Sequence, residues 1–148
     1  MLRTQLTHPD ILGVVARCGH HATILIADGN YPASSKKGPN AEVVSLNLSP
    51  GVVTCDQALA ALLSAVPVEA IHVMQTEADG PYALDGDPPV WADYRRTISD
   101  AGLGLDLTEV DKWGFYEKVE TPDHVLTVQT ADQQRYANVL LTVGVRMS

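Results

Sequence analysis

The chain has 148 residues, 45% of them hydrophobic, and this length matches one domain that buries about two-thirds of its unfolded surface. Its formal net charge of −8 comes from 18 acidic and 10 basic residues, and an anionic surface repels phosphate backbones and acidic membranes, so we expect neither nucleic acid nor membrane as a partner. No apolar run approaches the roughly 18 residues of a membrane span, and the N-terminus lacks the apolar core of a signal peptide. We therefore expect a single cytoplasmic domain over residues 1–148.

The first predicted elements are a short helix and a buried strand. Residues 8–19 place apolar side chains at helical spacing, with Asp10 as a candidate cap and Gly19 at the position of a left-handed C-terminal residue. The run TILIAD, residues 23–28, is typical of a strand covered on both faces. Asp28 closes this run, which places its carboxylate at the carboxyl end of the predicted strand.

A loop, a second strand and the clearest helix come next. Residues 29–42 are rich in Gly, Pro, Ser and Asn and form a long loop, which is equally a binding loop or a plain surface loop. The run VVSLNL predicts a strand. Thr54 and Gln57 then have the spacing of a capping box, and the leucines that follow lie along one helical face.

The second half of the chain alternates strands and helices. Residues 69–75 and 107–110 predict strands on either side of a helix that begins at Pro88 or Pro89 and ends at Gly102. The segment 111–120 holds three of the eight Phe, Trp and Tyr residues, and two more strands, HVLTVQT and NVLLTVGV, follow. This alternation predicts a three-layer α/β/α domain with a largely parallel central sheet, in which ligands bind beyond the carboxyl ends of the strands.

Several common site motifs are absent. The chain contains no GxGxxG, GxxxxGK[ST] or GxSxG sequence, which excludes the usual nucleotide-binding and serine-hydrolase fingerprints. Cys18 and Cys55 form no CxxC pair, and we expect both to be buried free thiols. HxH and HxxxH spacings are also missing, and two adjacent imidazoles make a poor chelate, so we expect no metal site.

His20 and Asp28 flank the first predicted strand. His20 follows Gly19 on a tight turn, from which a neutral imidazole can give and take a proton, although a histidine in such a turn is more often solvated or capping. We expect His21 to point away from its neighbour, so that only one of the two enters a given pocket. Asp28 is equally a surface cap or an acceptor for sugar hydroxyl groups.

Further candidates lie late in the chain. Tyr116 fits the core as well as a ligand platform, and Lys112 is either solvated or part of a site. Tyr136 and Asn138 stand at the mouth of the last predicted strand, where they face a ligand or pack in a hairpin. None of these signals is specific by itself.

Their order along the chain is more informative. Gly19-His20, TILIAD followed by GNYP, WADYRRTISDAG, KWGFYEKV and RYANVLLTVGV together resemble the ribose pyranase and fucose mutarotase family over nearly the whole chain. The FYE block is more similar to the fucose mutarotases. The resemblance implies a cytoplasmic, cofactor-independent isomerase that exchanges anomers, or pyranose and furanose rings, of a free monosaccharide. It also implies a ring-shaped homo-oligomer, commonly an octamer or decamer, with active sites near subunit contacts.

The resemblance also assigns residues. The proton donor of the family matches His20, its ligand-binding aspartate matches Asp28, and its Tyr-x-Asn ligand segment matches Tyr136 to Asn138. Lys112 occupies the position of an arginine or histidine ahead of the FYE block. We hypothesise that His20 is the acid-base group and that the sugar is bound by Asp28, Lys112, Tyr116, Tyr136 and Asn138.

Ala22 departs from the pattern, because many relatives carry an aspartate two residues after the histidine. If that aspartate orients the imidazole, His20 needs another partner in this chain. The departure leaves a second hypothesis open, a non-catalytic monosaccharide-binding or sugar-transport accessory protein that retains the pocket without the proton relay.

Overall fold

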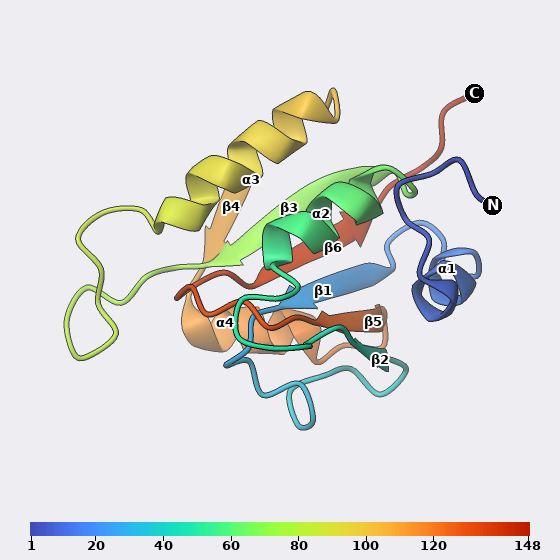
Figure 1. Ribbon diagram of the computed structural model, residues 1–148. Helices are drawn as coiled ribbons and strands as arrows, with labels where there is room; N and C mark the ends of the chain where they lie inside the picture. The colour runs from blue at the N-terminus through green and yellow to red at the C-terminus, as the bar shows by residue number, and fades with distance from the viewer.

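A computed structural model describes residues 1–148 as one six-stranded sheet with helices on both faces (Figure 1). In chain order the elements are α1 (Pro9–Val15), β1 (Thr23–Ala27), β2 (Glu42–Ser45), α2 (Cys55–Leu63), β3 (Val68–Met74), α3 (Pro89–Asp100), β4 (Leu107–Val110), α4 (Lys112–Val119), β5 (His124–Gln129) and β6 (Val139–Val143). None of the helices is both long and apolar enough to cross a membrane.

The strand order is β2-β5-β1-β6-β3-β4. The pairs β2 with β5, β5 with β1, and β3 with β4 are parallel, whereas β6 runs antiparallel to both of its neighbours. The prediction of a largely parallel sheet is therefore confirmed. As a consequence, five strands end at the edge of the sheet where β6 begins, so the segments that follow those strands meet the segment that precedes β6.

Side chains alternate along β1 between two apolar cores. Ile24 and Ile26 join the larger core beneath α1, α2 and α3, whereas Leu25 and Ala27 join a smaller core beneath α4. Figure 1 shows α2 and α3 in front of the sheet and α4 behind it. The predicted α/β/α layering is thus confirmed, and β1 lies at its centre.

Most predicted elements are confirmed, and the signals that start α2 and stop α3 acted as expected. In the capping box of α2, the Thr54 hydroxyl accepts from the Gln57 N–H at 3.2 Å, and the Gln57 side chain accepts from the Thr54 N–H at 3.0 Å. Gly102, just after α3, has a φ of 76°, which glycine adopts without steric cost. The two cysteines are free, with Cys55 buried and Cys18 half-buried, and burial raises the pKa of Cys55 to about 12.

The end of the first helix differs from the prediction. Helix α1 ends at Val15 rather than near Gly19, and Asp10 lies inside its first turn instead of capping it. The residue with a left-handed backbone is His21, at a φ of 72°. Its N–H donates to the Val143 carbonyl at 3.0 Å, so the turn into β1 is anchored on β6 and does not depend on a glycine.

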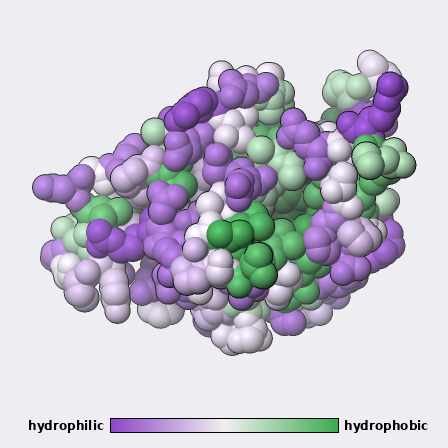
Figure 2. Space-filling view, viewed as in Figure 1, coloured by the Kyte–Doolittle hydropathy of each residue, from purple (hydrophilic) through white to green (hydrophobic).

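The surface is mostly hydrophilic on the face shown in Figure 2, with its apolar area near the middle, where the segment between β2 and α2 runs. Leu48 and Val52 of that segment are exposed. Two aromatic side chains are also exposed: Tyr82 lies in the segment before α3, and Trp113 lies at the start of α4.

Candidate functional site

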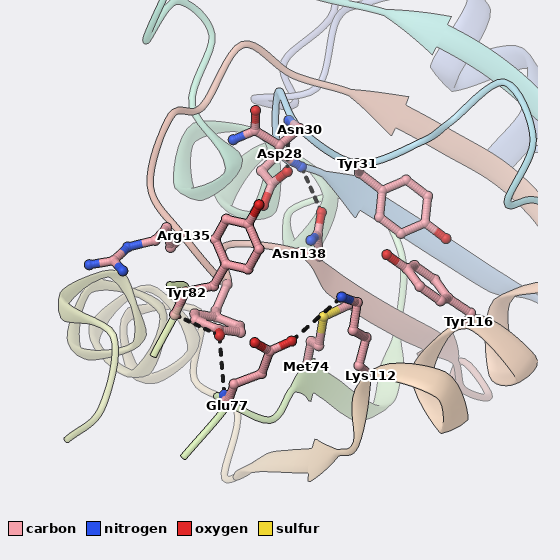
Figure 3. A pocket seen from close by; sticks show the side chains of 11 residues that line it. Asp28, Asn30, Tyr31, Met74, Glu77, Tyr82, Lys112, Tyr116, Arg135 and Asn138 are labelled. Carbon is pink, nitrogen blue, oxygen red and sulfur yellow. Dashed lines mark hydrogen bonds and ion pairs between the residues drawn. The ribbon is translucent and has the colours of Figure 1, made fainter. Parts of the chain in front are cut away.

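A cavity of about 500 Å³ opens where the carboxyl ends of the parallel strands meet the start of β6 (Figure 3). It is lined by Asp28, Asn30, Tyr31, Met74, Glu77, Tyr82, Lys112, Tyr116, Arg135, Tyr136 and Asn138. Five of the six predicted site residues therefore meet in one place, and His20 is the exception. The alternative that Tyr136 and Asn138 pack in a hairpin is wrong, because β5 and β6 are not neighbours in the sheet: β1 lies between them.

Asp28 is the most buried charged group of this cavity, with 4% of its surface exposed. One carboxylate oxygen accepts from the Asn30 N–H at 2.9 Å. Burial raises the pKa of Asp28 to about 6, although backbone N–H groups of Asn30 and Tyr31 partly oppose the shift, and the negative charge of Asp132 adds to it. A carboxyl group with this pKa exchanges its proton near neutral pH, which suits acid-base work as well as hydroxyl binding.

Asn138 is tied to Asp28 across the sheet. Its side-chain oxygen accepts from the Asp28 N–H at 2.8 Å, and 6% of the residue is exposed. Since the oxygen is used, the amide NH₂ group is the part of this side chain that remains available to a ligand. One strand end thus supplies an acceptor and the facing strand start supplies a donor.

Tyr136 has a strained backbone and a hydroxyl that already bonds to the protein. Its φ is 59°, a left-handed conformation that costs an L-residue about 1–2 kcal/mol. The hydroxyl donates to the Tyr82 carbonyl at 2.8 Å and accepts from the Glu77 N–H at 3.1 Å. Tyr136 therefore offers a ligand mainly its ring, and its hydroxyl holds the neighbouring segment.

Lys112 and Tyr116 lie one turn apart on α4, so both face the cavity. The Lys112 ammonium lies 3.5 Å from the Glu77 carboxylate and 5.7 Å from the centre of the Trp113 ring. Tyr116 packs edge-on against Tyr31, with 5.8 Å between ring centres. The flexible lysine is thus steadied by a carboxylate on one side and an aromatic ring on the other.

Several lining residues escaped sequence reasoning, among them Tyr31, Glu77, Tyr82 and Arg135. Tyr31 belongs to the GNYP loop, which we expected to be a candidate binding loop without naming a residue in it. Glu77 and Tyr82 lie in the segment that follows β3. The signal that could have found them is the rule that ligands bind beyond the carboxyl ends of parallel strands, applied to β3 as it was to β1.

His20 lies at the opposite edge of the sheet from the cavity. It precedes β1, whereas Asp28 follows it, and the five residues of that strand span about 16 Å. His20 instead lines a separate depression beside Cys18 and Pro67. Within one subunit, His20 and Asp28 therefore cannot contact the same monosaccharide.

Glu69, at the start of β3, is the partner of both histidines. Its carboxylate lies 3.0 Å from Nε2 of His20 and 3.6 Å from Nδ1 of His21, and the two imidazoles stack with ring centres 3.8 Å apart. The expectation that His21 points away from His20 is wrong, because the left-handed backbone of His21 brings its ring over that of its neighbour. The atoms with which these three exposed residues could bind a metal ion lie within 4.8 Å of one another. The same atoms form the contacts between the residues just described.

Comparison with known proteins places the chain among sugar-related relatives. A family model described as the RbsD / FucU transport protein family matches residues 1–146. The fucose mutarotase of Homo sapiens is 30% identical over 148 residues, covering 95% of this chain and 90% of that protein. The fold is shared with the fucose mutarotase of Streptococcus pneumoniae in complex with L-fucose, at 24% identity and a TM-score of 0.80 over 99% of this chain and 100% of that one. It is also shared with Bacillus subtilis RbsD complexed with D-ribose, at 18% identity and a TM-score of 0.74 over 99% and 100% of the two chains.

Proposed function

Because the chain belongs to the RbsD / FucU transport protein family, we propose that it is an isomerase, a sugar mutarotase or pyranase that interconverts ring forms of a free monosaccharide. The observation that carries this proposal is the cavity with a buried carboxylate, Asp28, whose pKa lies near 6. The polar groups of the lining suit a neutral polyol: the Asp28 carboxyl group and the Asn138 amide lie across an open space from the Glu77 carboxylate and the Lys112 ammonium (Figure 3).

The reaction is general acid-base catalysis. A proton is delivered to the ring oxygen of the cyclic hemiacetal while another leaves the anomeric hydroxyl, and the bond between the ring oxygen and the anomeric carbon breaks. The open-chain carbonyl rotates and recloses, either on its other face or through a different hydroxyl, with the reverse proton transfers. Each proton is returned within one cycle, and the anomeric carbon keeps its oxidation state, so the reaction needs no redox step. Positioned acid-base groups contribute roughly 10²- to 10⁴-fold. We propose a cofactor-independent, cytoplasmic enzyme.

We further propose that His20 acts in the cavity of a neighbouring subunit of a ring-shaped homo-oligomer, an octamer or a decamer. The separation of His20 and Asp28 along β1 supports this arrangement, as does the partly exposed imidazole, 43% of whose side-chain surface is accessible. The carboxylate that bonds the His20 imidazole comes from Glu69, since Ala22 has none. With Nε2 bonded to Glu69, the nitrogen of His20 that exchanges a proton with the sugar is Nδ1.

The remaining residues bind the sugar. Asp28 accepts a hydrogen bond from a sugar hydroxyl group and relays a proton. The Asn138 amide and the Lys112 ammonium donate hydrogen bonds to other hydroxyl groups, and Tyr116 contacts the face of the sugar ring. The complexes of the relatives with L-fucose and D-ribose support a fucose-like or ribose-like substrate.

A second candidate function is a non-catalytic monosaccharide-binding or sugar-transport accessory protein. Ala22 favours it, because the aspartate of many relatives is missing at that position. The contact between His20 and Glu69 weighs against it, since a carboxylate reaches the imidazole from β3 instead.

Saturation-transfer NMR on the anomeric protons of free sugars, including L-fucose and D-ribose, tests the proposal. We expect the wild-type protein to accelerate exchange and His20→Ala to lose at least a hundredfold of that acceleration. Binding without accelerated exchange would favour the accessory protein, and exchange unaffected by His20→Ala would reject the assigned role. Light scattering checks the assembly: a stable monomer at micromolar concentration contradicts the ring.

A further inference from the structure

The segment between β3 and α3, residues 75–88, borders the cavity and is bonded at two points to the hydroxyl group of one tyrosine. The hydroxyl of Tyr136 donates to the carbonyl of Tyr82 and accepts from the N–H of Glu77. Nearby, the guanidinium of Arg135 donates to the Ala83 carbonyl at 3.2 Å. The segment therefore contacts the residues before β6 at three points, two of which are the same oxygen atom.

Tyr136 is itself held in place from α3. The indole N–H of Trp91 donates to the Tyr136 carbonyl at 3.2 Å, and the hydroxyl of Tyr94 donates to the Ala137 carbonyl at 2.6 Å. Trp91 and Tyr94 are 1% and 0% exposed, so both anchors belong to the core. A strained left-handed residue that is fixed by two core side chains is the kind of feature that persists when it serves a site.

This arrangement fixes Glu77 on the side of the cavity opposite Asp28. Figure 3 shows the Glu77 side chain directed into the cavity, with one carboxylate oxygen toward Lys112 and Asp28 on the far side. At 3.5 Å, the contact between the Glu77 carboxylate and the Lys112 ammonium is at the long end of a hydrogen bond. Both side chains keep more than a third of their surface accessible, so the Glu77 carboxylate keeps free acceptor positions and the Lys112 ammonium keeps free donor positions.

We propose that Glu77 and Lys112 form a two-point site for neighbouring hydroxyl groups of the sugar, and that Tyr136 is the residue that positions Glu77. One hydroxyl donates to the carboxylate and the next accepts from the ammonium, so the pair selects aldoses that carry both hydroxyls of one vicinal diol. This inference rests on the proposed function, because it names the substrate class of the same cavity. A site built to bind a hydroxyl group rejects the deoxy analogue strongly, since its own polar groups are then left unpaired.

The experiment compares each parent sugar with its single-deoxy analogues. L-fucose is paired with its 2-, 3- and 4-deoxy derivatives, and D-ribose with its 2- and 3-deoxy derivatives. Exchange rates are measured by saturation transfer for the wild type, Glu77→Ala, Lys112→Met and Tyr136→Phe. Asp79→Asn is the matched control, because Asp79 is an exposed carboxylate of the same segment outside the cavity lining.

For the wild type, we expect a loss of at least tenfold in kcat/KM at two adjacent deoxy positions of the preferred sugar. Glu77→Ala should reduce that discrimination to less than threefold at one of the two positions, and Lys112→Met should do so at the other. Tyr136→Phe should weaken the discrimination at the deoxy position that depends on Glu77, while near-UV circular dichroism shows an intact fold. Asp79→Asn should keep the wild-type ratios of parent to deoxy sugar at both positions. Ratios of parent to analogue are insensitive to a general loss of folded protein, so they separate recognition from stability.

Two outcomes would overturn the inference while leaving the proposed function intact: Glu77→Ala slowing parent and deoxy sugars by the same factor, or the affected positions not being adjacent. If the wild type accelerates no exchange, the proposed function fails by itself. In that case, dissociation constants of the same sugars are measured by isothermal titration, and the parent and deoxy sugars are compared by their affinities. Equal affinities would reject the two-point site as well.

Discussion

The two ends of β1 carry the two principal groups of the proposed reaction in opposite surroundings. At the carboxyl end, Asp28 is buried and bonded within its own subunit, beside a formed cavity. At the amino end, the imidazole of His20 and the carboxylate of Glu69 form a hydrogen bond at the surface, and each residue keeps more than a third of its side chain accessible. In the proposed assembly, one chain builds the cavity that binds the sugar, and a second subunit brings its exposed His20 to that cavity.

The largest effect is expected at the buried end. Asp28→Asn keeps the shape and the acceptor for the Asn30 N–H but removes the titrating carboxylate, so sugar exchange should fall by about a hundredfold or more. The measurement is the saturation-transfer rate with near-UV circular dichroism as a check of folding. Exchange within threefold of wild type would show that Asp28 only shapes the loop.

The same substitution should raise stability in a pH-dependent way. The pKa of Asp28 is raised from 3.8 to about 6 in the folded protein. Between these values the folded state holds a proton that the unfolded state has lost, so the free energy of unfolding decreases as pH rises through this window. By pH 7.5 the free energy of unfolding of the wild type has fallen by up to about 3 kcal/mol, and Asp28→Asn avoids this loss. Urea denaturation at pH 3.5 and 7.5 checks this; an equal difference between the two proteins at both pH values would contradict it.

A smaller effect is expected at the exposed end, where Glu69 acts through His20. Glu69→Ala removes the carboxylate 3.0 Å from Nε2 of His20 and should slow exchange by about tenfold, equivalent to ~1.4 kcal/mol of barrier. Adding Ala22→Asp, which restores the aspartate of many relatives, should recover part of the loss. Glu42→Gln is the control, since it breaks an exposed ion pair elsewhere, with Arg17 at 3.0 Å. Equal slowing by both carboxylate variants would remove the special role of Glu69.

His21 should matter least. His21→Gly removes the ring stacked on His20 but relieves a left-handed backbone, so we expect exchange to change by less than threefold and stability by about 1 kcal/mol or less. Exchange rates and urea midpoints measure both. A tenfold loss of exchange would make the stacked pair, rather than His20 alone, the functional unit.

Sequence reasoning predicted what depends on local pattern. The capping box of Thr54 and Gln57, the stop at Gly102 and the strand at 107–110 were all confirmed, because each follows from a few neighbouring residues. The cavity residues Asp28 and Asn138 were found in the same way, as residues at the mouths of strands. The resemblance to a family then supplied their roles.

What could not be predicted depends on the order of strands. Glu69 meets His20 because β6 lies between β1 and β3, an order that no local pattern contains. The contact between Tyr136 and residues Glu77 and Tyr82 joins segments more than fifty positions apart in the same way. The orientation of His21 was missed because its left-handed φ is imposed by its bond to Val143, not by its residue type.

Subunit complementation tests the central claim most directly. His20→Ala and Asp28→Asn subunits, each inactive alone, are co-expressed with different tags, and oligomers carrying both tags are purified and assayed by saturation transfer. If His20 serves the cavity of a neighbour, randomly mixed rings should recover about a quarter of the wild-type exchange, because one contact in four joins the two intact residues. Mixed oligomers that stay as inactive as either parent would contradict a site shared between subunits.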